Sequence, residues 1–97
     1  MKRYAARRDN VELELIRFAR QLGAWLVQTD WPCDWILWWR GHWELVEIKD
    51  PEKEGHKDEF TPAQWEFRKE AQERGARLVI WRRDADVLAT LNATRGA

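Results

Sequence analysis

The chain has 97 residues, of which 35% are charged, and its acidic and basic side chains balance to a formal net charge of zero. This length suits one domain with a small core, which eight tryptophans enlarge. A single cysteine excludes an intrachain disulfide, and no apolar run reaches the roughly eighteen residues of a membrane span, so we expect a protein of the reducing cytoplasm without a membrane partner.

The first eight residues are basic and contain no acid. We expect residues 1–8 to form a poorly ordered arm, which either contacts DNA phosphates or is simply a solvated terminus. A neutral total charge does not exclude such binding, because local patches matter more. The basic residues of the arm are Lys2, Arg3, Arg7 and Arg8. Residues 9–97 would then form the single domain.

A helix is predicted to begin at Asp9 or Asn10, either of which can cap it, and to end near Leu22, because Gly23 can stop it. Its apolar stripe is Val11, Leu15, Phe18, Ala19 and Leu22. A short strand over residues 24–28 follows.

Residues 34–39 and 43–49 are strand-like and flank a turn that contains Gly41. A two-residue loop pairs Trp39 with His42 and places Asp34 directly opposite Glu47. A slip of one residue would move Asp34 to the other face.

This register would bring two carboxylates and one ammonium group together. Glu47 and Lys49 are two residues apart, so both point to one face of a strand, where Asp34 would join them. Carboxylate oxygens suit a hard cation such as Mg²⁺, and a neighbouring lysine can position an attacking water. The set suits hydrolysis of a phosphodiester, although an ordinary amphipathic hairpin with Asp34 at its edge also explains the pattern.

A dense charged loop over residues 50–59 is expected to be mobile, and a strong helix start follows it. Thr61 and Gln64 have the spacing of a capping box, with proline between them at the first helical position. Phe60 and Trp65 fall at the positions of a hydrophobic staple. The helix should end near residue 74, before a glycine.

The chain should finish with a buried strand over residues 77–82 and a short helix over residues 85–92 capped by Asp84. Inward-facing residues of that helix would be Val87, Leu88 and Leu91. The element order α-β-β-β-α-β-α predicts an α/β fold, with a mixed central sheet flanked by helices.

These motifs, taken in order, resemble those of the PD-(D/E)XK nuclease superfamily, in particular the small stand-alone VRR-NUC and Holliday-junction-resolvase-like nucleases of phages. The resemblance covers residues 9–92. It comprises Glu14 nine residues before Gly23, Pro32-Cys33-Asp34, Glu47-Ile48-Lys49, Thr61-Pro62-Ala63-Gln64, and Gly75 before the strand Leu78–Trp81. The sequence departs from the family at Cys33, which separates the proline from the aspartate.

The resemblance implies a restriction-endonuclease-like core and an Mg²⁺- or Mn²⁺-dependent DNA endonuclease, and it leaves open a selectivity for branched or flapped DNA. Asp34, Glu47 and the backbone carbonyl of Ile48 would bind the metal, and Lys49 would orient the water. The family also implies a homodimer in the cytoplasm of a phage host or bacterium. No organic cofactor is implied.

The acid on the first helix and Gln64 each have two alternative assignments. Glu12 and Glu14 flank the apolar stripe about equally and both suit a solvated helix start; the spacing to Gly23 selects Glu14 as a second-metal or water-mediated ligand. Gln64 would reach Lys49 or the scissile phosphate, yet a capping box already explains it, and one conformation can hardly serve both.

Other readings remain open. The same fold could serve as a module that binds DNA or a protein without cutting, or as a small structural protein with aromatic surfaces. Cys33 is either a nucleophile or, as we favour, a small strand residue. His42 and His56 lack metal-ligand spacing and are taken as surface residues.

Overall fold

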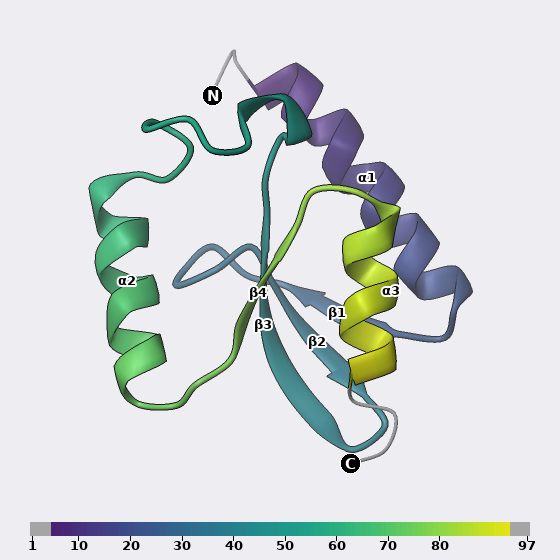
Figure 1. Cartoon of the computed structure of the whole chain (residues 1–97). Helices are drawn as coiled ribbons and strands as arrows, with labels where there is room; N and C mark the ends of the chain where they lie inside the picture. The colour runs from purple at the N-terminus through teal and green to yellow at the C-terminus, as the bar shows by residue number, and fades with distance from the viewer. Residues whose placement is uncertain (1–4, 94–97) are drawn as a thin grey trace.

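The protein is described by a computed structural model over residues 5–93. Within these residues, three α-helices and four strands follow one another in the predicted order, and a short 3₁₀ helix that was not predicted lies in the charged loop (Figure 1). They are α1 (Ala5–Gln21), β1 (Trp25–Gln28), β2 (Trp35–Trp39), β3 (His42–Ile48), η1 (Pro51–Lys53), α2 (Pro62–Glu73), β4 (Leu78–Trp81) and α3 (Asp84–Ala93). Within the described residues, no helix combines the length and apolar character needed to cross a membrane.

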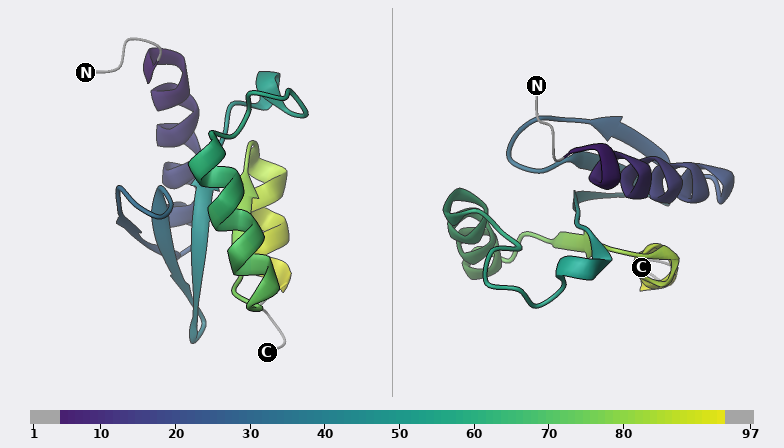
Figure 2. Two further views of the ribbon diagram at one scale, coloured as in Figure 1. Left: turned by 90° about the vertical axis from the view of Figure 1, so that its left-hand side faces the viewer. Right: turned by 90° about the horizontal axis from the view of Figure 1, so that it is seen from above.

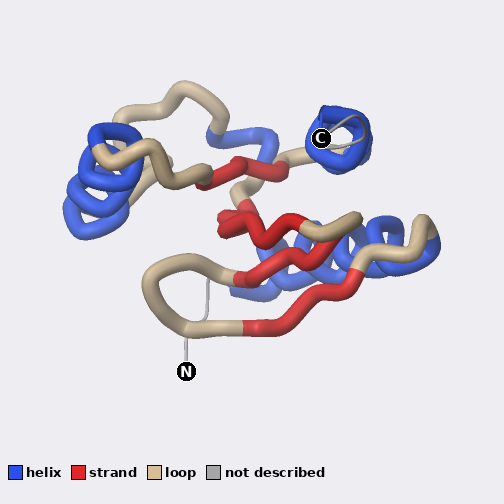
Figure 3. The backbone as a smooth tube through the Cα atoms, turned by 90° about the horizontal axis from the view of Figure 1, so that it is seen from below, coloured by secondary structure: helices blue, strands red, loops and turns tan. Residues whose placement is uncertain are grey.

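The strands form one mixed sheet in the order β1-β2-β3-β4. The pairs β1–β2 and β2–β3 are antiparallel, and β3–β4 is parallel. Helices α1 and α3 lie on one side of the sheet and α2 lies on the other, beside β4 (Figures 2 and 3). The prediction of an α/β fold with a mixed sheet flanked by helices is therefore confirmed.

The hairpin has the predicted register. Trp39 pairs with His42, so the loop consists of Arg40 and Gly41 alone, and Trp35 pairs with Val46. Both loop residues have positive φ, 50° and 87°, as a two-residue turn matched to strand twist requires. One step further along this ladder, Asp34 falls beside Glu47.

The core lies between the sheet and the pair α1 and α3. Its largest fully buried side chains are Leu37, Val46, Ile48, Trp81 and Val87. Buried indole N–H groups need acceptors. Trp81 Nε1 donates to Thr90 Oγ1 at 2.9 Å, and Trp39 Nε1 donates to the Leu91 carbonyl at 3.0 Å.

Three details of the helices differ from the predictions. Helix α1 begins at Ala5, so the helix includes residues 5–8 of the expected arm, because alanine and arginine favour helix. Leu22 and Leu88 are 40% and 42% exposed rather than inward-facing. Asp84 does not cap α3; Asp86 instead accepts from the backbone N–H groups at its start. The predicted phosphate contacts of Lys2, Arg3, Arg7 and Arg8 lie outside what the structure describes, since it omits residues 1–4 and the side chains of Arg7 and Arg8.

The charged loop after β3 is fastened to the start of α3. Glu59 receives two hydrogen bonds from the Arg82 guanidinium, at 2.7 and 3.0 Å. Glu54 accepts from Arg83 at 2.9 Å, and Asp50 caps η1 by accepting from the Glu52 N–H at 2.9 Å. The loop is therefore held by specific contacts, and its mobility stays a prediction.

Glu44 and Glu59 are buried carboxyl groups whose pKa values move in opposite directions. Burial raises the pKa of Glu44, and the Arg77 guanidinium 3.4 Å away opposes this only in part, without making a hydrogen bond to the buried Oε1. Burial also acts to raise the pKa of Glu59, but the hydrogen bonds and charge of Arg82 outweigh it and bring that pKa below its ordinary value.

Replacing Glu44 with glutamine will therefore raise the Tm at neutral pH. A carboxyl group whose pKa is raised by folding stabilises the folded state fully below its ordinary pKa of 4.5. This stabilisation is lost as the pH rises through the folded-state pKa, so Glu44 does not supply it at neutral pH. Each kcal/mol gained would raise the Tm of a domain of this size by about 4–8 °C.

Glu59→Gln is the matched control, because the same chemical change should lower the Tm at neutral pH and matter less in acid. Thermal melts followed by circular dichroism from roughly pH 3 to pH 8 check both signs. A lower neutral-pH Tm for Glu44→Gln than for the wild type would contradict this account.

Candidate functional site

The end of β3 places Glu47 and Lys49 together on the face of the sheet that looks toward α2. Both side chains are buried, and Lys49 Nζ lies 3.5 Å from Glu47 Oε2. The strand alternates, so Val46 and Ile48 point into the core on the opposite face. The predicted pairing of these two charged groups is therefore present in the structure.

Asp34 joins them from the neighbouring strand. Its backbone N–H donates to the Val46 carbonyl at 3.1 Å, which extends the ladder one residue beyond β2. Its carboxylate Oδ2 accepts from the Ile48 N–H at 2.8 Å. Thr29 holds the preceding turn, since its N–H donates to the Asp34 carbonyl and its hydroxyl to the Cys33 carbonyl, at 2.9 and 2.6 Å.

Gln64 serves the helix cap and the site at the same time. Its Oε1 accepts from the Thr61 N–H at 3.0 Å and from Lys49 Nζ at 2.8 Å, while its Nε2 donates to Glu47 Oε2 at 2.8 Å. The expectation that one conformation could hardly do both is wrong, because a carbonyl oxygen accepts two hydrogen bonds and the amide nitrogen is left to donate.

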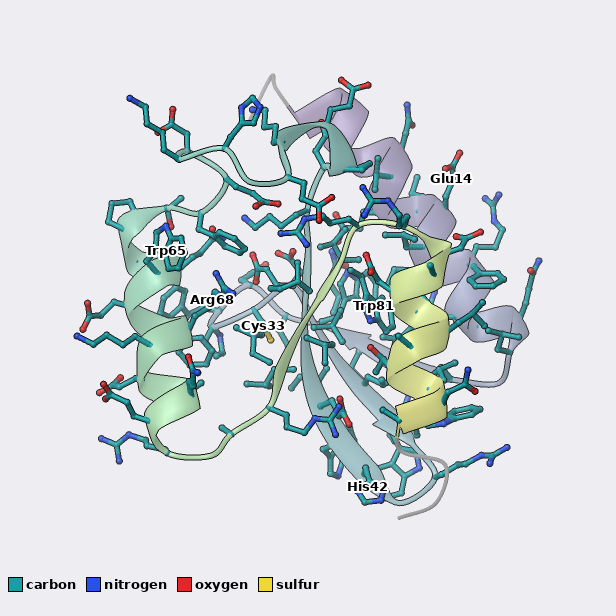
Figure 4. The ribbon with its side chains drawn as sticks, in the orientation of Figure 1. Glu14, Cys33, His42, Trp65, Arg68 and Trp81 are labelled. Carbon is teal, nitrogen blue, oxygen red and sulfur yellow. The ribbon has the colours of Figure 1, made fainter. Side chains whose placement is uncertain are left out.

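Aromatic rings border the Lys49 ammonium. Its Nζ lies 5.0 Å from the centroid of the Phe60 ring, and Phe60 also meets Trp65 in the predicted staple, at 5.3 Å between centroids. The Arg68 guanidinium lies over both rings, at 4.2 and 4.9 Å. Figure 4 shows Trp65 and Arg68 on α2, with Arg68 directed toward the sheet. The ammonium is thus held by an amide oxygen, a carboxylate and a ring face.

Cys33 is a packed structural residue. It is 2% exposed, and its Sγ donates to the Trp35 carbonyl at 3.2 Å. Burial raises the pKa of its thiol, and the negative charges of Glu47 and Asp34 raise it further. A thiol so disfavoured as thiolate is a poor nucleophile at neutral pH.

No contact links the helix-one acids Glu12 and Glu14 to this group in the described structure. Glu14 is exposed on α1 (Figure 4). It borders a depression that Arg82 and Arg83 also line. Glu12 accepts from Trp35 Nε1 at 2.6 Å and so satisfies a core indole. Within residues 5–93, no three His, Cys, Asp or Glu side chains converge as a metal site. A metal role for Glu14 therefore stays a prediction.

The chemistry of the donors at the end of β3 suits a hard cation. Asp34 and Glu47 supply carboxylate oxygens. The N–H and C=O of one strand residue point the same way, so the Ile48 carbonyl faces the side on which its N–H meets Asp34. These three donors would hold Mg²⁺ or Mn²⁺, with waters completing the octahedron.

The sequence pointed to most of this site but missed two supporting residues. Thr29, which holds the turn before Asp34, was hidden because its partners are the backbone carbonyls of Cys33 and Asp34. Phe60 had a visible signal as the staple residue, yet its place beside Lys49 depends on how α2 docks. His56 is exposed and His42 half-buried in the described structure, as expected for surface residues. A scan of protein-family models, and searches of curated proteins and of solved structures, found no match to this chain.

Proposed function

We propose that the protein is a metal-dependent endonuclease that hydrolyses DNA phosphodiester bonds on a restriction-endonuclease-like fold. The observation that carries this proposal is the linked set of Glu47, Gln64 and Lys49 beside Asp34, at the end of β3. Burying Glu47 and Lys49, with Asp34 half-buried beside them, costs free energy that ordinary packing would not require, so a function at this site accounts for their presence.

Each side chain has a distinct task in this proposal. Asp34 and Glu47 would hold the cation together with the Ile48 carbonyl. A bound Mg²⁺ or Mn²⁺ would lower the pKa of a coordinated water and offset phosphate charge. Lys49 would donate a hydrogen bond to the attacking oxygen. It would also stabilise the negative charge that develops on the oxygens bound to phosphorus. Gln64 would fix the direction of the ammonium, as a positioning residue.

The bond changes follow from in-line displacement. Water oxygen forms a bond to phosphorus and loses a proton, while the bond between phosphorus and the 3′ oxygen breaks. The products would carry 5′-phosphate and 3′-hydroxyl ends. The basic residues Lys2, Arg3, Arg7 and Arg8 remain predicted phosphate contacts, and the homodimer remains a prediction.

The test is cleavage of labelled duplex, flap, four-way-junction and single-stranded DNA by purified protein in Mg²⁺, Mn²⁺ or EDTA. We expect cutting in either metal and none in EDTA, and the order of rates shows whether branched DNA is preferred. Binding without cleavage in every condition would overturn the proposal and favour a non-cutting DNA-binding module.

Gln64→Ala will slow cleavage by about 10–100-fold, because Lys49 loses the acceptor that directs it. It will also destabilise the protein by about 1 kcal/mol through loss of half the capping box. Single-turnover rates and thermal melts measure the two effects separately.

Thr61→Ala is the matched control, since Thr61 Oγ1 accepts from the Gln64 N–H at 3.1 Å and belongs only to the cap. It should cost a similar stability and leave the cleavage rate within about twofold of wild type. Equal rates for Gln64→Ala and Thr61→Ala would show that the glutamine acts through the helix alone.

A further inference from the structure

Part of the α2-facing side of the sheet is not covered by a helix. Helix α2 lies beside β4, and within residues 5–93 no helix covers β1 and β2 on this side (Figure 3). Trp25 and Trp43 are 56% and 55% exposed there. The tryptophan patch consists of Trp25, Trp38 and Trp43, one from each of β1, β2 and β3.

The three indoles form one cluster. Trp43 lies 4.9 Å from Trp38 and 5.6 Å from Trp25 between ring centroids, with interplanar angles of 57° and 52°. Rings tilted in this way do not cover one another's faces as a parallel stack would. Large exposed indoles on adjacent strands are unusual on a surface without a partner.

The tryptophan patch shares a sheet face with the candidate active site. Trp38 and Asp34 are four residues apart near β2, and Trp43 and Glu47 are four residues apart on β3, so side-chain alternation puts all four on one face. Four residues of strand span about 13 Å. A nucleic-acid strand held at Lys49 can therefore reach the patch within a few nucleotides.

Charge and area favour nucleobases as the occupant. Between Trp35 and Trp43 the chain has a basic residue, Arg40, and no acidic one, so a phosphate backbone would meet no negative side chain in this part of the hairpin. A buried tryptophan contributes about 150–250 Å², so the exposed parts of Trp25 and Trp43 offer roughly 250 Å². That is far below the ~800 Å² per partner of a stable protein interface.

We propose that the tryptophan patch stacks unpaired bases of the DNA strand whose phosphodiester lies at Asp34, Glu47 and Lys49. The inference rests on the proposed nuclease function, and it assigns the substrate class as DNA with a single-stranded portion, such as a flap or frayed end. Base stacking on aromatic side chains contributes about 1–3 kcal/mol per base, and it tolerates any sequence because every base has a π face.

The experiment measures binding in EDTA, so that it does not depend on catalysis. Fluorescence anisotropy compares a labelled oligothymidylate with an abasic oligonucleotide of equal length, which keeps the phosphates and lacks the bases. Trp43→Ala and Trp25→Ala should each weaken oligothymidylate binding by about 5–150-fold and leave abasic binding unchanged. Trp43→Phe, which keeps a π face, should retain most of the affinity, and Trp43→Leu serves if the alanine variant does not fold.

Leu13→Ala is the control, because Leu13 is 61% exposed on α1, away from the patch. The proposal would be overturned if the variants lost equal affinity for both oligonucleotides or lost none for either. It would also be overturned if the wild type did not bind oligothymidylate. A change from dimer to monomer in sedimentation of Trp43→Ala would overturn it too, since the face would then join two copies of the chain. Duplex cleavage by the wild type, measured separately, reports on the nuclease function alone.

Discussion

Asp34→Asn will fold as the wild type does and will cleave DNA at least 10²–10³-fold more slowly, roughly the loss seen when one preorganised electrostatic group is removed. Asparagine keeps an oxygen that can accept from the Ile48 N–H, the 2.8 Å contact that ties the side chain to β3. It removes the negative charge that would hold the cation. The variant thus separates the chemistry of Asp34 from its structural role.

Single-turnover rates in Mg²⁺ and a thermal melt check this prediction together. Asp30→Asn is the matched control, because it makes the same change at an exposed position four residues away in the same turn and should leave the rate unchanged. A folded Asp34→Asn protein that cuts at the wild-type rate would contradict the assignment of Asp34.

Trp81→Ala will destabilise the protein by about 3–5 kcal/mol, the usual cost of removing a large buried aromatic side chain. Trp81 is fully buried and its Nε1 donates to Thr90 at 2.9 Å, so the substitution leaves a cavity and removes this hydrogen bond. A stability of about 5–15 kcal/mol is typical of a domain, so a loss of this size removes a large part of the stability and lowers the Tm.

The backbone next to Trp81 links this core residue to the candidate site. The Trp81 carbonyl accepts from the Lys49 N–H at 3.0 Å, so loosening β4 should also lower the cleavage rate. Urea unfolding measures the stability change. Trp25→Ala is the control, since its side chain is more than half exposed and should cost under about 1 kcal/mol. If Trp81→Ala and Trp25→Ala lost similar free energies of unfolding, the assignment of Trp81 to the stabilising core would be contradicted.

The hairpin and its carboxylates could be predicted from the sequence because the constraint is local. A glycine between two apolar runs fixes a two-residue turn, and the register then determines that Asp34 meets Glu47. The same reasoning located the capping box, because Thr61 and Gln64 are three residues apart whatever the tertiary fold.

Features that depend on how elements dock could not be predicted from local patterns. Only the resemblance suggested that Gln64 reaches Lys49, and its contact with Glu47 was not predicted. Both contacts require α2 to approach the end of β3, and helix-cap spacing says nothing of that approach. The same holds for Glu12, whose hydrogen bond to Trp35 crosses from α1 to the sheet. Strand parity divided the tryptophans between two faces, but which of them stay exposed depends on where α2 stops covering the sheet.

The central claim is that two carboxylates at the end of β3 support metal-dependent cleavage of DNA. The most direct measurement is the release of 5′-phosphate ends from a labelled flap duplex by wild type in Mg²⁺, by wild type in EDTA, and by Asp34→Asn in Mg²⁺. We predict product in the first reaction alone. Equal product in all three reactions, or none in the first while the protein binds the DNA, would contradict the claim.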